Sequence, residues 1–206
     1  MNNDKFIKYL KECPIIAILR GITPDESESI SEELYSLGIR IIEVPLNSPD
    51  PYTSIGLLKD KFKDKAIIGA GTVLNKSEVI KLHNIGAEII IAPNLDIDVG
   101  IKTKEYNMIW LPGVFTPTEG FTALKYGADG LKIFPSELIS PDIIKSWKSV
   151  FPKDIKIIPV GGVDSTNGSQ FLLNGADGLG IGSAIFKAGD TLDMVKQKTE
   201  KILQSL

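Results

Sequence analysis

A unit of helix, glycine and strand recurs along the chain and restricts its possible folds more than any other feature. Four times a helical pattern ends at a glycine placed directly before a run that reads as a strand. The glycines are Gly38, Gly86, Gly127 and Gly175. A glycine at this place suits the left-handed turn that ends many helices. The recurrence predicts a chain built by repeating one α/β unit.

Eight short runs rich in apolar and β-branched residues alternate with the helical patterns. The runs are 15–20, 39–46, 66–73, 89–94, 108–114, 130–135, 156–163 and 178–183. Several are apolar at consecutive positions, as in a parallel sheet that helices cover. Eight units in 206 residues give about 26 residues each, which is short for a barrel of typically about 250 residues. We therefore predict one α/β domain over residues 1–206, a compact (β/α)₈ TIM barrel. An open doubly wound sheet is the alternative, although its usual Gly-x-Gly-x-x-Gly after the first strand is absent.

Helix start signals support this division of the chain. Thr23 and Thr116 are each followed by a proline, which at Thr23 precedes an acidic pair, and Asn75 precedes a third helical pattern. Such residues cap helices, and proline suits the first helical position. Residues 4–12 predict an extra N-terminal helix that covers one end of the barrel, and residues 190–206 predict the last barrel helix.

Composition excludes several classes of protein. The formal net charge is −3, from 23 basic and 26 acidic residues, and no basic stripe indicates nucleic-acid binding. No apolar run reaches the roughly 18 residues of a membrane helix, and the N-terminus lacks the apolar core of a secretory signal. Because Cys13 and His83 are the only residues of their types, a disulfide scaffold and a His-rich zinc site are excluded. The sequence thus predicts a cytoplasmic protein whose chemistry uses lysine, glutamate, arginine and backbone amides.

Lys132 is the strongest candidate for a nucleophile. It alternates with Leu131 and Ile133 in a predicted strand, so it points into the barrel if those two residues face the helices. Burial lowers the pKa of an amine, and a neutral amine attacks ketones. The alternative is a strand-end lysine whose charged end reaches water.

Glu43 lies among apolar residues of the second predicted strand, where an unpaired carboxylate is costly. It is interpreted as a general acid or base, with a structural salt bridge as the alternative.

Arg20 ends the first strand and suits a carboxylate or phosphate, unless it is an ordinary exposed arginine. Thr72 ends the glycine-rich segment 69–72 and offers a hydroxyl group to a ligand. Tight packing explains that segment equally well.

Glycines also end the seventh and eighth strands, where barrels commonly hold a phosphate group. The residues concerned are Gly161, Gly162, Gly182 and Ser183. Their exposed backbone amides predict a phosphate site, with close packing as the alternative.

Several motifs together resemble one enzyme family. The chain reads IIAILRGIT at 15–23, IRIIEVPLNSPDP at 39–51, IGAGTV at 68–73, LKIFPS at 131–136 and IPVGGV at 158–163. These segments are similar to the class I 2-keto-3-deoxy-6-phosphogluconate and 2-keto-3-deoxy-6-phosphogalactonate aldolases. The resemblance covers nearly the whole chain.

The resemblance implies a lyase that needs no metal or organic cofactor, and a homotrimer in the cytoplasm. It places the Schiff-base lysine at Lys132, the general acid/base at Glu43 and a carboxylate-binding threonine at Thr72. It places apolar contacts with the pyruvyl group at Pro93 and Phe134. The phosphate loops fall on the glycine-rich segments already described.

One position separates the two branches of this family. The phosphogluconate enzymes usually carry an arginine four residues after the glutamate, and this chain has Asn47 there. Asn47 and the LRG segment at 19–21 resemble the phosphogalactonate branch, in which Arg20 would take over part of the anion binding and Asn47 would bind substrate. Cleavage of 2-dehydro-3-deoxy-6-phosphogalactonate is therefore expected. The alternatives are the phosphogluconate epimer (with 4-hydroxy-2-oxoglutarate), a phosphosugar isomerase of the same fold, and a non-catalytic sugar-phosphate binder.

Overall fold

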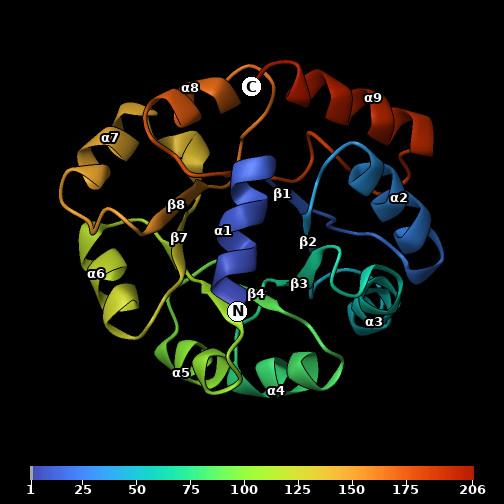
Figure 1. The fold of residues 1–206 in the computed structure, drawn as a ribbon, viewed down its shortest axis with the longest axis horizontal. Coiled ribbons are helices and arrows are strands. Elements are labelled where there is room, and N and C mark those ends of the chain that lie inside the picture. Colours follow the sequence, from blue (N-terminus) through green and yellow to red (C-terminus); the bar gives the residue numbers. More distant parts are fainter. Residues whose placement is uncertain (1) are drawn as a thin grey trace.

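The computed structural model describes residues 2–206, and its strands lie inside a ring of helices (Figure 1). The strands are β1 Ile15–Ile18, β2 Ile41–Pro45, β3 Ile67–Gly71, β4 Ile89–Ile91, β5 Ile109–Leu111, β6 Gly113–Val114, β7 Gly130–Ile133, β8 Lys156–Pro159 and β9 Leu179–Ile181. They form a parallel six-stranded sheet, ordered β5-β4-β3-β2-β1-β9, and a parallel three-stranded sheet, ordered β6-β7-β8. The expected α/β class is confirmed, and the parallel sheet is curled.

The helices follow the strands in the expected alternation. They are α1 Asn2–Glu12, α2 Pro24–Ser36, α3 Pro51–Phe62, α4 Lys76–Asn84, α5 Ile97–Glu105, α6 Pro117–Lys125, α7 Asp142–Lys148, α8 Gly168–Leu173 and α9 Leu192–Leu203, with a short 3₁₀ turn, η1, at Ser136–Leu138. Figure 1 shows α2 to α9 around the outside and α1 across the middle of the ring. This arrangement differs from a doubly wound sheet, in which helices cover both faces. Within residues 2–206, no helix combines the length and the apolar character needed to cross a membrane.

The sequence signals for helix ends are confirmed. The side chains of Asn75 and Thr116 accept hydrogen bonds from backbone N–H groups at the starts of α4 and α6. The four recurring glycines all have positive φ, from 81° to 100°, which is the left-handed conformation that the repeat required. Each repeat therefore ends its helix by the same backbone turn.

One predicted strand is interrupted. The run 108–114 forms two strands, β5 and β6, separated by Pro112. Proline has no N–H group to donate to a sheet, although the carbonyl oxygen of Pro112 accepts a 3.0 Å bond from the backbone of Lys132. The chain thus passes from the edge of one sheet to the other at this residue.

Strand alternation divides the core into two layers. Ile15, Ala17 and Leu19 pack in the outer layer, between the strands and the helices. Ile16 and Ile18 pack in an inner layer within the curl of the sheet. The inner layer contains mostly isoleucines, so a charged residue that faces inward is in apolar surroundings.

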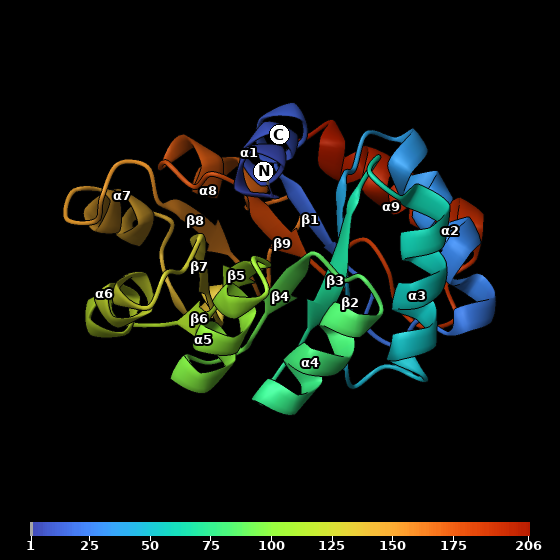
Figure 2. The same ribbon diagram turned by 60° about the horizontal axis from the view of Figure 1, so that its bottom comes forward.

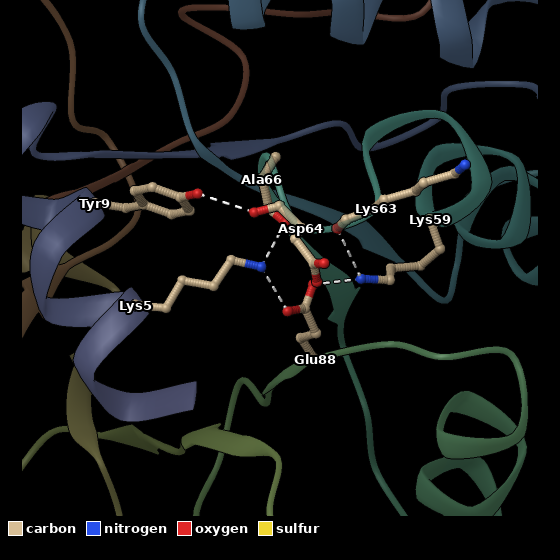
Figure 3. Close-up of polar contacts among 7 residues, drawn as sticks. All are labelled: Lys5, Tyr9, Lys59, Lys63, Asp64, Ala66 and Glu88. Carbon is tan, nitrogen blue, oxygen red and sulfur yellow. Dashed lines mark hydrogen bonds and ion pairs between the residues drawn. The ribbon is translucent and has the colours of Figure 1, made fainter. Parts of the chain in front are cut away.

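Helix α1 closes the inner layer at the amino-terminal ends of the strands. Its residues Phe6, Tyr9 and Leu10 belong to the inner layer, and Figure 2 shows the helix at one end of the sheets. Lys5 and Lys59 both pair with Glu88, while the Tyr9 hydroxyl donates to a backbone carbonyl (Figure 3). These contacts hold α1 in place and leave the carboxyl-terminal ends of the strands as the open end.

Candidate active site

Lys132 lies on the inner face of β7. Its neighbours Leu131 and Ile133 pack in the outer layer, as alternation in a strand requires. Only 5% of Lys132 is exposed, and its Nζ lies 4.9 Å from the centroid of the Phe134 ring. The side chain is therefore enclosed and does not extend into solvent.

The surroundings of Lys132 favour the neutral amine. Burial lowers the pKa of Lys132; the negative charge of Glu43 raises it and the positive charge of Arg20 lowers it further. Removing an ammonium group from water disfavours its charged form. A lysine with a lowered pKa can attack a carbonyl carbon as a nucleophile.

Glu43 lies on β2 and is 1% exposed. Burial raises the pKa of Glu43 to about 7, against the lowering effects of Lys132, Arg20 and a hydrogen bond from the backbone of Gly71. Within the described residues its Oε2 is buried without a hydrogen-bond partner. A carboxyl group that titrates near neutral pH can both take up and release a proton.

The glycines of β3 make room for the groups around them. A Cβ atom at Gly71 would lie 1.9 Å from Oε2 of Glu43, and one at Gly69 would lie 2.0 Å from the carbonyl oxygen of Ile89. Both distances are far below any van der Waals contact. Close packing therefore accounts for these two glycines, and Gly71 is needed for the position of Glu43.

The ends of β1, β2 and β3 bring three predicted binding residues together. Arg20 donates from Nη1 to Oδ1 of Asn47 at 2.5 Å, and its Nη2 lies 3.5 Å from Oγ1 of Thr72. Thr72 has a φ of 57°, a strained value for a β-branched residue. The guanidinium group thus lies between two polar side chains, at the open end of the strands.

A cavity of about 150 Å³ contains most of the predicted residues. Its lining includes Arg20, Lys132, Phe134, Gly161, Gly162, Gly182 and Ser183. Gly161 and Gly162 have φ values of 97° and 69°, so this glycine pair adopts a turn that other residues rarely form. The lysine and the glycine-rich loops therefore face one cavity, whose lining does not include Glu43 or Thr72.

Pro93 lies in a neighbouring pocket of about 300 Å³, which shares Phe134 with the first cavity. A Cβ atom at Gly113 would lie 2.3 Å from the backbone of Pro93, so strands β4 and β6 approach closely at this point. Pro93 therefore shares a pocket with Phe134 and does not line the cavity of Lys132.

The sequence interpretation missed five residues of this region, of which Ile18 and Val163 supply apolar lining to the cavity. Val160 and Gly180 line the cavity and are joined by an isolated parallel bridge. Ser48 binds the loop that follows Arg20. The glycine-rich motifs contain or adjoin Val160 and Gly180, whereas no local pattern distinguishes Ser48 from an ordinary turn serine.

A buried amine with a lowered pKa, beside a buried carboxyl group at the open end of a curled parallel sheet, suits imine chemistry on a keto compound. Comparison with known proteins agrees with that chemistry. The family model for KDPG and KHG aldolase matches residues 6–203, and the chain belongs to this family. Aldolases are lyases, so the protein is a lyase.

Two curated relatives match most of the chain. The 2-dehydro-3-deoxy-6-phosphogalactonate aldolase of Escherichia coli (strain K12) is 40% identical over 199 residues, covering 97% of each chain. The 2-dehydro-3-deoxy-phosphogluconate aldolase of Zymomonas mobilis is 30% identical over 166 residues, covering 80% of this chain and 78% of the relative. A solved structure described as native KDPGal superimposes with a TM-score of 0.92, at 41% identity and 94% coverage of both chains.

Proposed function

We propose that the protein is a class I aldolase that cleaves 2-dehydro-3-deoxy-6-phosphogalactonate to pyruvate and glyceraldehyde 3-phosphate. The observation that carries the proposal is the burial of Lys132 in a cavity that glycine-rich loops also line, within reach of the charge of the buried Glu43. The choice of the galactonate epimer is supported by the 40% identical relative of that name, compared with 30% for the phosphogluconate relative.

The reaction begins at Lys132. Its neutral amine attacks the ketone carbon, and loss of water gives an iminium ion, which accepts electrons from the neighbouring carbon. Glu43, titrating near pH 7, takes the proton from the hydroxyl group two carbons away as the carbon–carbon bond breaks. Glyceraldehyde 3-phosphate leaves, the enamine is protonated, and water releases pyruvate from Lys132.

The remaining residues bind the two ends of the substrate. Arg20 and Thr72 hold the carboxylate, with Asn47 next to them. Phe134, in the cavity, and Pro93, in the pocket that shares Phe134 with it, provide apolar surface near the pyruvyl group. The phosphate is held at the glycine-rich loops, by Gly161, Gly162, Gly182 and Ser183. Backbone amides at such loops favour anions.

We further propose that residues 1–206 form one closed (β/α)₈ barrel domain. In support, backbone bonds from Asp129 and Lys132 reach Trp110 and Pro112, on the path from β5 to β6. At the other junction, β8 continues to Val160, which bridges to β9. If β5 and β6 are taken as a single interrupted strand, the two sheets together form one closed sheet of eight strands.

The protein is further proposed to be a cytoplasmic homotrimer. A 42% identical relative occurs in a cage designed by fusing symmetric oligomeric domains. Light scattering of the purified protein is expected to give three times the mass of the chain; a monomer mass would refute the trimer.

Borohydride reduction in the presence of pyruvate tests the central step. Mass spectrometry is expected to find a reduced pyruvate adduct on Lys132. Failure to form the adduct would favour an isomerase of the same fold, and sugar-phosphate binding without turnover would favour a binding protein. Comparison of kcat/KM on the two epimers tests the substrate, and a clear preference for 2-dehydro-3-deoxy-6-phosphogluconate would refute the galactonate assignment.

A further inference from the structure

The loop after β2 contacts the loop after β1 at two points. Ser48 Oγ accepts a hydrogen bond from the backbone N–H of Gly21 at 3.0 Å. Oδ1 of Asn47 accepts a hydrogen bond from the guanidinium of Arg20 at 2.5 Å. Two consecutive residues of one loop therefore hold both the backbone next to Arg20 and its charged group.

The backbone contact is well defined. Ser48 is 8% exposed, and its own N–H donates to the carbonyl of Pro45, the last residue of β2, at 2.9 Å. Gly21 has a φ of 86°, so the chain makes a left-handed turn immediately after Arg20. The hydroxyl of Ser48 fixes that turn relative to the end of β2.

The side-chain contact determines where the positive charge lies. Arg20 is exposed, and a free arginine side chain occupies many rotamers. Its bond to Asn47 directs Nη2 towards Thr72 and keeps the charge where it acts on Lys132 and Glu43. The Oδ1 of Asn47 is engaged by Arg20 and is not directed at the cavity, whose lining does not include Asn47.

We propose that Asn47 and Ser48 are positioning residues, which hold Arg20 at the cavity that Lys132 lines instead of binding substrate themselves. The inference rests on the proposed aldolase function and refines the role of Asn47, which the sequence assigned to substrate binding. The inference also gives a role to Ser48, for which the sequence analysis predicted none.

A double-mutant cycle tests this proposal. Asn47→Ala and Ser48→Ala are each expected to raise KM for the keto acid by about 3- to 10-fold, the effect of one lost hydrogen bond, with a smaller change in kcat. In an Arg20→Ala background either substitution should have almost no further effect, because residues that act through one group are not additive. Ser48→Thr retains a hydroxyl and should restore KM. Ser36→Ala removes a serine hydroxyl at the end of α2 and serves as the control.

The pH dependence of pyruvate trapping by borohydride gives a second measurement. Arg20 lowers the pKa of Lys132 and Glu43 raises it, so a misplaced Arg20 charge raises the pKa of the lysine. The increase of trapping rate with pH should therefore move to higher pH in Asn47→Ala, and not in Ser36→Ala.

Additive effects of Asn47→Ala and Arg20→Ala, or an unchanged pH profile, would overturn the positioning role while leaving the aldolase assignment intact. Failure of the wild-type protein to trap pyruvate would instead overturn the proposed function, and the positioning role with it. The two failures are thus distinguished by the wild-type reaction alone.

Discussion

The buried carboxyl group of Glu43 should make the stability of the protein depend on pH. Burial raises the pKa of Glu43 from 4.5 to about 7. Because the folded state holds this proton more tightly than the unfolded state, the stability that it contributes is complete below about pH 4.5 and is lost as pH rises through 7. At about 1.4 kcal/mol per pH unit, the loss is about 3 kcal/mol.

Substitution of Glu43 by glutamine isolates this contribution. Glutamine has nearly the same shape and stays neutral, so Glu43→Gln has no charge to bury at high pH. We expect the free energy of unfolding of the variant, minus that of the wild type, to increase by about 3 kcal/mol between pH 4.5 and pH 8. Over the same range kcat should be reduced by about 10²- to 10⁴-fold, because proton transfer is lost.

Urea unfolding followed by circular dichroism, at intervals across this pH range, measures the difference. Glu12→Gln is a matched control, because the Glu12 side chain is 48% exposed and its charge remains in water. A difference for Glu43→Gln that stays constant with pH would refute the argument, since it would mean that the wild-type carboxylate ionises in the folded protein as easily as in the unfolded chain.

Three further substitutions test other parts of the structure. Lys132→Arg should fold normally yet lose nearly all turnover and all borohydride trapping, because arginine stays protonated and forms no imine; measurable trapping at another lysine would contradict the assignment. Gly71→Ala places a Cβ atom 1.9 Å from Oε2 of Glu43 and should reduce stability by about 1–3 kcal/mol, measured by urea unfolding; wild-type stability and activity together would refute the packing argument. Glu88→Gln removes the partner of two lysines beneath α1 and should cost about 1–3 kcal/mol without changing KM; a changed KM would show that the two ends of the strands are coupled.

Features that depend on short-range periodicity were predicted from the sequence. The alternation of Leu131, Lys132 and Ile133 was sufficient to place the lysine on the inner face, because strand residues alternate by geometry alone. The glycines after four of the helices were equally informative, because positive φ is tolerated by few other residues. Both signals depend only on residues that are neighbours along the chain, so they can be recognised in a single sequence.

Features that depend on contacts between distant residues were not predictable in this way. Gly71 allowed two interpretations, a ligand approach or tight packing, until the carboxylate of Glu43 was found where its Cβ would lie. The interruption of the run 108–114 at Pro112 depends on which strand donates a hydrogen bond to the carbonyl oxygen of Pro112. The contact between Ser48 and Gly21 joins two loops 27 residues apart. No residue pattern within either loop predicts that the two loops are in contact.

Charged groups are paired at the amino-terminal ends of the strands, whereas reactive groups are buried without full pairing at the carboxyl-terminal ends. This difference explains why the reactive groups can be buried. At the amino-terminal ends, Glu88 has two lysine partners and α1 covers the apolar interior. At the carboxyl-terminal ends, Glu43 has a buried oxygen without a hydrogen-bond partner in the described chain, and the amine of Lys132 is enclosed. Groups held in unfavourable surroundings persist only where the rest of the structure determines their position. Burial is also what raises the pKa of the acid and lowers that of the amine, so the feature that reduces stability is the one that makes proton transfer and imine formation possible near neutral pH.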